Sequence, residues 1–269
     1  MKNKRKMYQN RVERFPLPAF EDVKEQVIVS LTSYGQRISR IMPTIKTLQN
    51  QSRKPDKIVI YIAYQDEVLV TDELRNANLV EIRLCEDTLS HKKFNGIYDF
   101  PDSYIAIADD DLLYHEDWLK VLLQTNQINR NCVTAHVTFI LEQPGTNWGR
   151  VATRKDNISS MRGRYHFYVM SGPGVLIPPH CDLHELKEGF KFCPHCDEKC
   201  LTYLLAYKNI PVLATSMQPD LYHSESYKIP NDALWENYNC KHQKERFAEA
   251  KAFIASLRLK EKNNSQKFV

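Results

Sequence analysis

Apolar residues along this chain occur in short uninterrupted runs, and the stretches between these runs are polar or amphipathic. In the first half, such runs predict buried β-strands at residues 27–31, 57–63, 79–84 and 104–108. Helical patterns are found at Ile38, Ile41, Ile45 and Leu48, at residues 72–77 and at residues 116–123. Strands and helices therefore alternate, which favours an α/β fold with a mostly parallel central sheet flanked by helices.

The second half of the chain has a less regular pattern. Strands are predicted at residues 133–139 and 210–214, and a helix at 197–207. Apolar segments also lie on both sides of the turn Ser171-Gly-Pro-Gly174. A last helix is predicted from about residue 241 to 259, with a stripe typical of packing against a core, formed by Phe247, Ala250, Ile254 and Leu257.

The 269 residues contain no repeat, low-complexity tract or linker that would divide them into separate domains. We therefore expect a basic, loosely held lead-in at 1–25, one domain at 26–240, and a C-terminal amphipathic helix with a polar tail at 241–269. There are 37 basic and 33 acidic residues, a net charge of +4, and much of the excess lies at the two ends. The ends are either solvated, the commoner case, or in contact with an anionic membrane surface.

Composition also bears on the compartment. No apolar run approaches the roughly 20 residues needed to span a bilayer, and no apolar segment follows the charged N-terminus as in a signal peptide. We therefore expect a cytoplasmic protein. Seven cysteines, an odd number, fit reduced thiols in that compartment better than a disulfide framework.

Three adjacent carboxylates, Asp109, Asp110 and Asp111, directly follow the apolar strand at 104–108. Adjacent negative charges repel unless a cation or basic groups lie against them. Ligands of open α/β sheets bind outside the carboxyl ends of the strands, so this is the expected place for a metal-diphosphate site. The alternative is a solvated acidic turn that begins the helix at 116–123.

Other residues in the first half supply groups that a nucleotide-diphosphate site needs. Thr32, Ser33, Tyr34 and Arg37 follow the first strand and offer hydroxyl, aromatic and guanidinium groups to a nucleotide. The carboxylates suit Mn²⁺ or Mg²⁺, which prefer oxygen ligands. Lys92 or Lys93 would balance the charge of a departing diphosphate.

At these positions the sequence resembles the GT-A-fold glycosyltransferases, in particular the family 2-like enzymes of bacterial capsule and lipopolysaccharide synthesis. The resemblance runs from about residue 26 to 240. It rests on Val27-Ile-Val-Ser-Leu-Thr-Ser-Tyr34, Arg37-Ile38, Thr44-Ile-Lys-Thr-Leu-Gln-Asn-Gln51, Lys54-Pro-Asp-Lys-Ile58, His91-Lys-Lys-Phe94, Asp109-Asp-Asp-Leu-Leu-Tyr114, Asp117-Trp118, Ser171-Gly-Pro-Gly-Val-Leu-Ile-Pro-Pro179, Cys196-Asp-Glu-Lys199 and Asn231-Asp-Ala-Leu-Trp235.

The resemblance implies a Rossmann-type GT-A domain with a nucleotide-sugar half at about 26–125 and an acceptor half at about 126–240. Its donor would be a nucleotide sugar and its acceptor a glycan or lipid-linked saccharide, with inversion at the anomeric carbon. Asp111 would be a direct metal ligand and Asp109 a contact to ribose or metal, with Asp110 beside them. The implied nucleotide-sugar-binding residues are Thr32, Ser33, Tyr34, Arg37, Lys92, Asp109 and Asp110.

In the acceptor half, the resemblance makes Asp197 the general base that takes the acceptor's hydroxyl proton. The adjacent Glu198 is the alternative. His223 occupies the place of a late metal-binding histidine, although a lone histidine is more often structural. Trp148 and Trp235 offer faces for stacking on a sugar ring, whereas Trp118 has the spacing of a core residue.

The segment Cys193-Pro-His-Cys-Asp-Glu-Lys-Cys200 departs from the family pattern. Its cysteines are either free structural thiols, which we favour, or part of a structural zinc site formed by Cys193, Cys196 and Cys200. Cys181, His180 or His184 would complete that site.

Two further classes of function remain open from the residues alone. A nucleotidyltransferase or a nucleotide-sugar hydrolase would use the same metal-diphosphate half. A zinc-stabilised interaction module would have no catalytic activity. Nucleic-acid binding is not indicated, because basic and aromatic residues do not alternate along any stretch.

Overall fold

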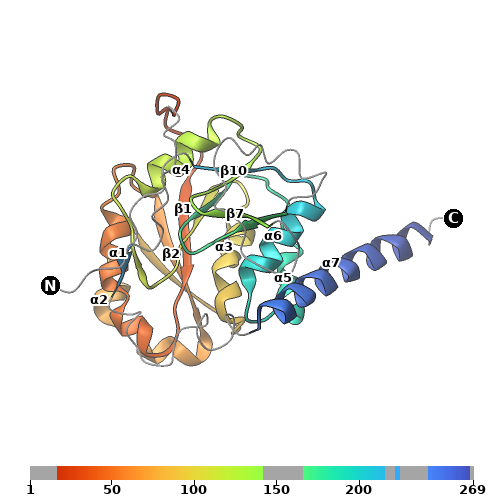
Figure 1. The fold of residues 1–269 in the computed structure, drawn as a ribbon. Coiled ribbons are helices and arrows are strands. Elements are labelled where there is room, and N and C mark those ends of the chain that lie inside the picture. The colour runs from red at the N-terminus through yellow and green to blue at the C-terminus, as the bar shows by residue number, and fades with distance from the viewer. Residues whose placement is uncertain (1–16, 142–165, 216–221, 225–241, 267–269) are drawn as a thin grey trace.

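The computed structural model describes residues 17–141, 166–215, 222–224 and 242–266. A seven-stranded sheet forms its centre, in the spatial order β10-β6-β9-β4-β1-β2-β3 (Figure 1). Its strands are β1 (Val27–Thr32), β2 (Lys57–Ala63), β3 (Val80–Cys85), β4 (Tyr104–Ile107), β6 (Val133–Ala135), β9 (Val175–Ile177) and β10 (Val212–Ala214). The pairs β4–β1, β1–β2, β2–β3 and β10–β6 are parallel, and only β9 runs antiparallel to its neighbours in this sheet.

Helices cover both faces of the sheet, which explains why the central strands are apolar on both sides. Successive residues of β1 belong to opposite layers: Ile28 packs in one core, and Val27 and Val29 pack in the other. One layer contains α1 (Met42–Gln49), α2 (Asp72–Arg75) and α4 (Trp118–Asn126). The other contains α3 (Asn95–Asp99), α5 (Leu186–Phe192), α6 (Asp197–Tyr207) and α7 (Gln243–Gln266).

Short elements lie around this core. Three 3₁₀ helices follow the first three strands, at η1 (Gly35–Arg40), η2 (Tyr64–Leu69) and η3 (Leu89–Phe94). Two antiparallel pairs lie outside the main sheet, formed by β5 (Leu112–Leu113) with β11 (Tyr222–His223) and by β7 (Thr138–Leu141) with β8 (His166–Val169).

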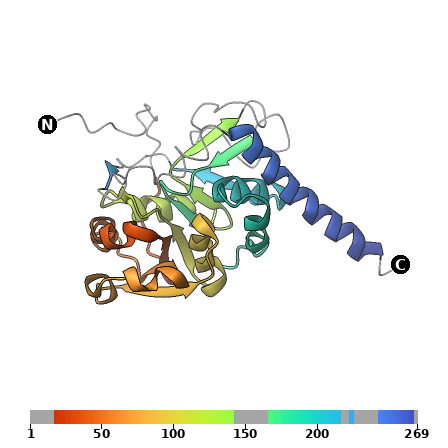
Figure 2. The same ribbon diagram turned by 90° about the horizontal axis from the view of Figure 1, so that it is seen from below.

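The last helix, α7, packs its first half on α5 and α6 and extends away from the body beyond them (Figure 2). The predicted stripe of Phe247, Ala250, Ile254 and Leu257 is buried, together with Phe253. Leu259, further along, is 60% exposed. Among the described helices, none combines the length and apolar character required to cross a membrane.

The predicted α/β class with a mostly parallel, helix-flanked sheet is confirmed, but one predicted strand is wrong. Residues 133–139 form two strands, β6 and β7, that belong to different sheets. The break falls at His136, whose ring is hydrogen-bonded to Thr215 Oγ1 (3.0 Å) and to the carbonyl of Trp118 (2.9 Å). Those tertiary contacts override the uniform β propensity of the segment.

The expectation of reduced cysteines is also wrong at two positions. Cys193, at the end of α5, and Cys200, in α6, form a disulfide. Zinc binds the thiolate form of cysteine, so the predicted zinc site at Cys193, Cys196 and Cys200 loses two of its three sulfur ligands. Cys85, Cys132, Cys181 and Cys196 are free thiols, as predicted.

Candidate active site

The acidic triplet lies at the carboxyl end of β4, in the middle of the sheet between β1 and β9. The main-chain pairing with β1 continues past the strand, where Ala108 N donates to Ser30 O (3.1 Å). The chain then turns through Asp109, Asp110 and Asp111 into β5. The three carboxylates are thereby placed at the sheet edge where open α/β folds bind ligands.

The middle carboxylate, Asp110, is turned into the protein and is only 7% exposed. Its Oδ2 accepts a hydrogen bond from Ser33 Oγ (2.6 Å), and its Oδ1 lies 3.2 Å from Arg37 Nη2. Burial raises the pKa of Asp110 to about 7, although the Arg37 charge opposes the shift. The predicted nucleotide contact through Asp110 stays a prediction, and the visible role of this side chain is to hold the loop after β1.

The outer two carboxylates remain partly open to solvent. Asp109 is 35% exposed and Asp111 is 18% exposed. Arg37 Nη2 lies 2.5 Å from Asp111 Oδ2, and Lys93 Nζ lies 2.8 Å from Asp109 Oδ1. Hard oxygen atoms at the surface of a sheet edge, supported by a buried third acid, fit the ligand preference of Mn²⁺ or Mg²⁺.

Lys93 links the triplet to the second half of the chain. Its Nζ lies 2.8 Å from Asp109 Oδ1 and also 2.8 Å from Asp197 Oδ2, at the start of α6. Burial alone would lower the pKa of Lys93, but the charges of Asp109 and Asp197 outweigh burial and raise it. The lysine is therefore a charged, buried bridge between two carboxylates.

Asp197 is fixed by several donors. Besides Lys93, Ser90 Oγ donates to its Oδ1 (2.8 Å) and Ser171 Oγ to its Oδ2 (3.3 Å). Burial alone would raise the pKa of Asp197, but Lys93, His91 and Ser90 lower it to about 2. The carboxylate is therefore ionised and held in place, and it is a weak proton acceptor.

The neighbouring Glu198 lies in a different environment. Its Oε2 accepts from the hydroxyl of Tyr168 (2.6 Å), and its Oε1 accepts from the backbone N–H of Ser171 (3.1 Å). Burial, and then the charge of Asp197, raise the pKa of Glu198. Of the two acids at the start of α6, Glu198 is therefore the stronger proton acceptor.

The turn Ser171-Gly-Pro-Gly174 packs directly on the triplet. A Cβ on Gly172 would lie 2.1 Å from Asp109 Oδ2, so any larger residue there would force the carboxylate or the turn to move. The Tyr114 hydroxyl donates to Gly172 O (2.8 Å) and accepts from Asp109 N (2.7 Å). Trp118, buried as predicted, donates from Nε1 to Pro173 O (2.7 Å). The turn thus sets the position of Asp109.

The predicted nucleotide loop follows β1 directly. Thr32 Oγ1 donates to Tyr61 O (2.7 Å), which ties the loop to β2. The guanidinium of Arg37 lies over the ring of Tyr34, 5.4 Å from its centroid. Thr32, Ser33, Tyr34 and Arg37 therefore lie together at the edge that carries the triplet.

The two adjacent lysines of η3 point to different groups. Lys92 Nζ contacts Asp87 Oδ1 (2.6 Å), just after β3, whereas Lys93 reaches the triplet. Consecutive side chains of a 3₁₀ helix diverge by about 120°, so only one of the two lysines can face the triplet and the other faces Asp87. The sequence left Lys92 and Lys93 as alternatives, and the family resemblance chose Lys92, because nothing local distinguishes the two.

Three further predicted residues are placed only in part or not at all. His223 in β11 pairs with Leu112, and the next residue, Ser224, donates its N–H to Asp111 O (2.7 Å). The backbone of the late histidine is therefore next to the triplet. Trp148 and Trp235 lie outside the described residues.

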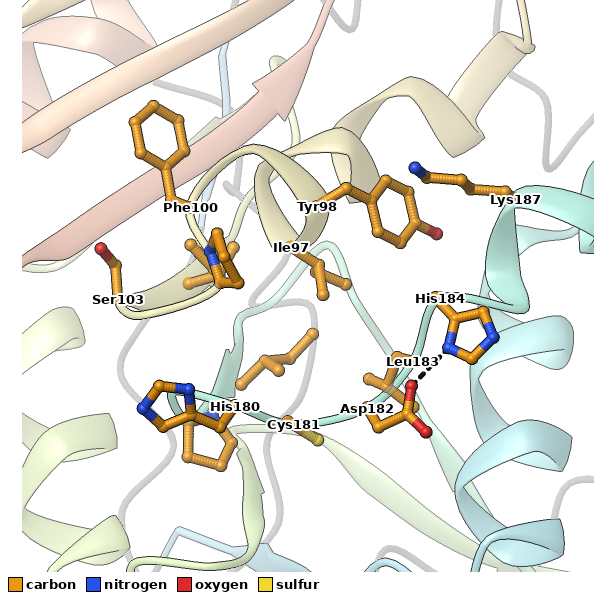
Figure 3. Close-up of a pocket in the computed structure, with 14 residues that line it drawn as sticks. Ile97, Tyr98, Phe100, Ser103, His180, Cys181, Asp182, Leu183, His184 and Lys187 are labelled. Carbon is orange, nitrogen blue, oxygen red and sulfur yellow. Dashed lines mark hydrogen bonds and ion pairs between the residues drawn. The ribbon is translucent and has the colours of Figure 1, made fainter.

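A cavity of about 380 Å³ opens at the opposite end of β4 and β9 from the triplet, where Ile105 and Ile177 line it (Figure 3). Asp182 and His184 lie on its rim and, with Glu185, form a potential metal cluster. Lys208 Nζ already contacts both acids, at 2.7 Å and 2.6 Å. One of the two negative charges is thereby compensated, and the cluster includes an acid, Asp182, that is 65% exposed, as acids without a metal commonly are. The acidic edge is therefore the better candidate site.

Comparison with known proteins gives a match in structure but none in sequence. No protein-family model matches the chain, and no curated protein matches it in sequence. Among solved structures, it is similar to a crystal structure of GalNAc-T7 with UDP, GalNAc and Mn²⁺, with 13% sequence identity and a TM-score of 0.50. The similarity covers 75% of this chain and 44% of that protein, so the chain spans less than half of its length.

The similarity defines a structural class. The mixed sheet with its antiparallel β9, flanked by helices and carrying an acidic triplet after β4, is a GT-A fold.

Proposed function

We propose that this protein is a metal-dependent glycosyltransferase that moves a sugar from a nucleoside-diphosphate donor to an acceptor hydroxyl. One observation carries the proposal. At the carboxyl edge of a GT-A sheet, a single buried ammonium group lies 2.8 Å from an acid of the donor half, Asp109, and 2.8 Å from an acid of the acceptor half, Asp197. A transferase has to bring its donor-binding and acceptor-binding groups together, and this lysine, Lys93, contacts one acid of each.

The donor would lie over the loop after β1. Thr32, Ser33, Tyr34 and Arg37 would bind the nucleotide, with Lys92 further along the same edge. Asp111 and Asp109 would hold Mn²⁺ or Mg²⁺, with His223 as a further ligand. When bound, the metal stabilises negative charge on the departing diphosphate.

The transfer itself is proposed to invert the anomeric carbon. A carboxylate at the start of α6 accepts the acceptor's hydroxyl proton, the oxygen bonds to the anomeric carbon, and the bond from that carbon to the diphosphate oxygen breaks. The family resemblance assigns the proton to Asp197. The raised pKa of Glu198 and the pKa of about 2 at Asp197 favour Glu198 instead.

The acceptor is proposed to be a growing bacterial surface glycan, of a capsule or lipopolysaccharide, or a lipid-linked precursor. The supporting observation is the set of family-like motifs between residues 26 and 240. Such an enzyme would work in the cytoplasm. Arg258, Lys260 and Lys262 are exposed in the second half of α7 and suit peripheral contact with an anionic membrane.

An activity assay tests the proposal. Purified protein is incubated with nucleotide sugars and Mn²⁺, with and without saccharide acceptors that carry a hydrophobic aglycone, and released nucleoside diphosphate is measured. We expect an acceptor to raise release at least tenfold, and Asp111→Asn to abolish it. Equal release without acceptor would indicate a hydrolase. Formation of nucleoside triphosphate and sugar 1-phosphate when pyrophosphate is added in place of the acceptor would indicate a nucleotidyltransferase.

A further inference from the structure

The bridge made by Lys93 is held rigidly from several sides. The lysine's own carbonyl accepts a hydrogen bond from Ser30 Oγ in β1 (2.6 Å), so its backbone is tied to the centre of the sheet. Its side chain is only 4% exposed. Ser90, three residues earlier in η3, donates to the other oxygen of Asp197 (2.8 Å). One short segment therefore fixes the first turn of α6 at two points.

The bridge also lies between two parts of the site with different tasks. Asp109 belongs to the edge proposed to bind the donor, and its place is set by Gly172. Asp197 is followed directly by Glu198, which the proposed mechanism uses as proton acceptor. An ion pair removed from solvent is screened less than a surface pair, so its geometry is maintained strongly.

We propose that Lys93 is a positioning residue that ties the start of α6 to the donor-side acid and thereby keeps Glu198 in register with the bound sugar. This inference rests on the proposed function. Lys93 would touch neither the donor nor the acceptor. Its loss would leave donor binding in place, because Asp111, Arg37 and the loop after β1 remain, and would impair transfer to the acceptor.

A double-mutant cycle tests this role. The proteins are wild type, Lys93→Met, Asp197→Asn and the double variant, in which one charge of each sign is removed. For each we would measure transfer turnover, donor KM and donor hydrolysis to water. We expect each single variant to lose transfer turnover about 30-fold or more, with donor KM changed less than threefold, and the double variant to lose no more than either single one.

Hydrolysis separates positioning from general damage. Water needs no aligned acceptor, so the ratio of transfer to hydrolysis should fall at least tenfold in all three variants. Lys93→Arg should recover part of the transfer rate. Lys208→Met is the matched control: it removes another lysine that bridges two acids, Asp182 and Glu185, at the far end of α6, and should leave both rates unchanged.

The outcomes distinguish this inference from the proposed function. The positioning role would be overturned if the fold-losses of the two single variants multiplied in the double variant, or if transfer and hydrolysis fell equally. The proposed transferase function would stand in either case. If Lys93→Met does not fold, the transfer rate of Asp197→Asn is compared with that of the charge-paired double variant. Equal rates would support the positioning role, and a lower rate in the double variant would overturn it. Absence of any transfer or nucleotide binding by the wild type would instead overturn the proposed function.

Discussion

The three aspartates of the triplet, although adjacent, have three different environments. Asp109 faces Lys93, Asp111 faces Arg37, and Asp110 is buried against Ser33. Two internal cations thus compensate three acids, which leaves the edge able to accept a further positive charge. Substitutions along the triplet should therefore have unequal effects, because each carboxylate has its own partner.

Gly172→Ala should disturb Asp109 without removing any charge. The added methyl group would lie 2.1 Å from Asp109 Oδ2, so the carboxylate or the turn has to move. We expect Mn²⁺ affinity, measured by calorimetry, to fall at least tenfold, while the urea-unfolding midpoint shows that the protein still folds. An unchanged affinity would mean that Asp109 does not help to hold the metal.

The Asp197 carboxylate should make the free energy of unfolding depend on pH in the acidic range. Its pKa is about 2 in the folded protein against an ordinary value of 3.8, so the unfolded chain binds the proton more tightly. The stabilisation is therefore complete well above pH 4 and is lost as the pH falls through 2. Relative to neutral pH, we expect the contribution of Asp197 to the free energy of unfolding to fall by about 1 kcal/mol at pH 3 and by about 2 kcal/mol at pH 2.

Urea unfolding of wild type and Asp197→Asn between pH 7 and pH 2 checks this dependence. The variant lacks the group, so the difference in unfolding free energy between the two proteins should shrink on acidification. A constant difference across the range would show that the Asp197 carboxylate keeps an ordinary pKa.

The sequence allowed prediction of the residues whose signal is local. Asp109, Asp110 and Asp111 follow an apolar strand, and the loop from Thr32 follows another. Lys93 was one of two candidate lysines, but its contact with Asp197 could not be predicted, because Asp197 lies far away in the sequence and meets it only through folding. Asp87, Ser90 and Tyr168 were missed for the same reason, since single polar residues in loops carry no periodic signal.

At the scale of elements, α6 and α7 behave differently. Helix α6 covers the predicted range 197–207, because its buried leucines and the polar residues before it define both ends. Helix α7 was predicted to end near residue 259 and continues to Gln266, since its stripe of core contacts stops before its helical backbone does. The strand predicted at 133–139 broke because contacts of His136 outweigh local propensity.

Phe253→Ala in α7 should destabilise the protein by about 3–5 kcal/mol, because a fully buried ring is replaced by a cavity. Leu259→Ala, six residues later on the exposed part of the same helix, is the matched control and should stay within about 0.5 kcal/mol. Urea unfolding measures both. Similar losses in the two variants would mean that the projecting part of α7 is packed against another surface.

At the scale of the molecule, the GT-A sheet brings both halves of the chain to one edge. The proposed donor side comes from β1, η3 and β4, and the proposed acceptor side comes from β9, the turn before it and α6. The alternation of strands and helices predicted the first part of this arrangement. The antiparallel insertion of β9 beside β4 could not be predicted from local pattern, because it depends on which distant strand pairs with the sheet centre.

The most direct test of the account is a thermal-shift screen of wild type and Asp111→Asn with UDP-, GDP-, CMP- and dTDP-sugars, each with and without Mn²⁺. A ligand at about 100 times its Kd should raise the melting temperature by roughly 5–10 °C. We predict such a shift for one nucleotide class in the wild type, only with Mn²⁺, and its loss in Asp111→Asn. No shift with any nucleotide in the folded protein, or a shift independent of metal and of Asp111, would contradict the assignment of the acidic triplet as a donor site.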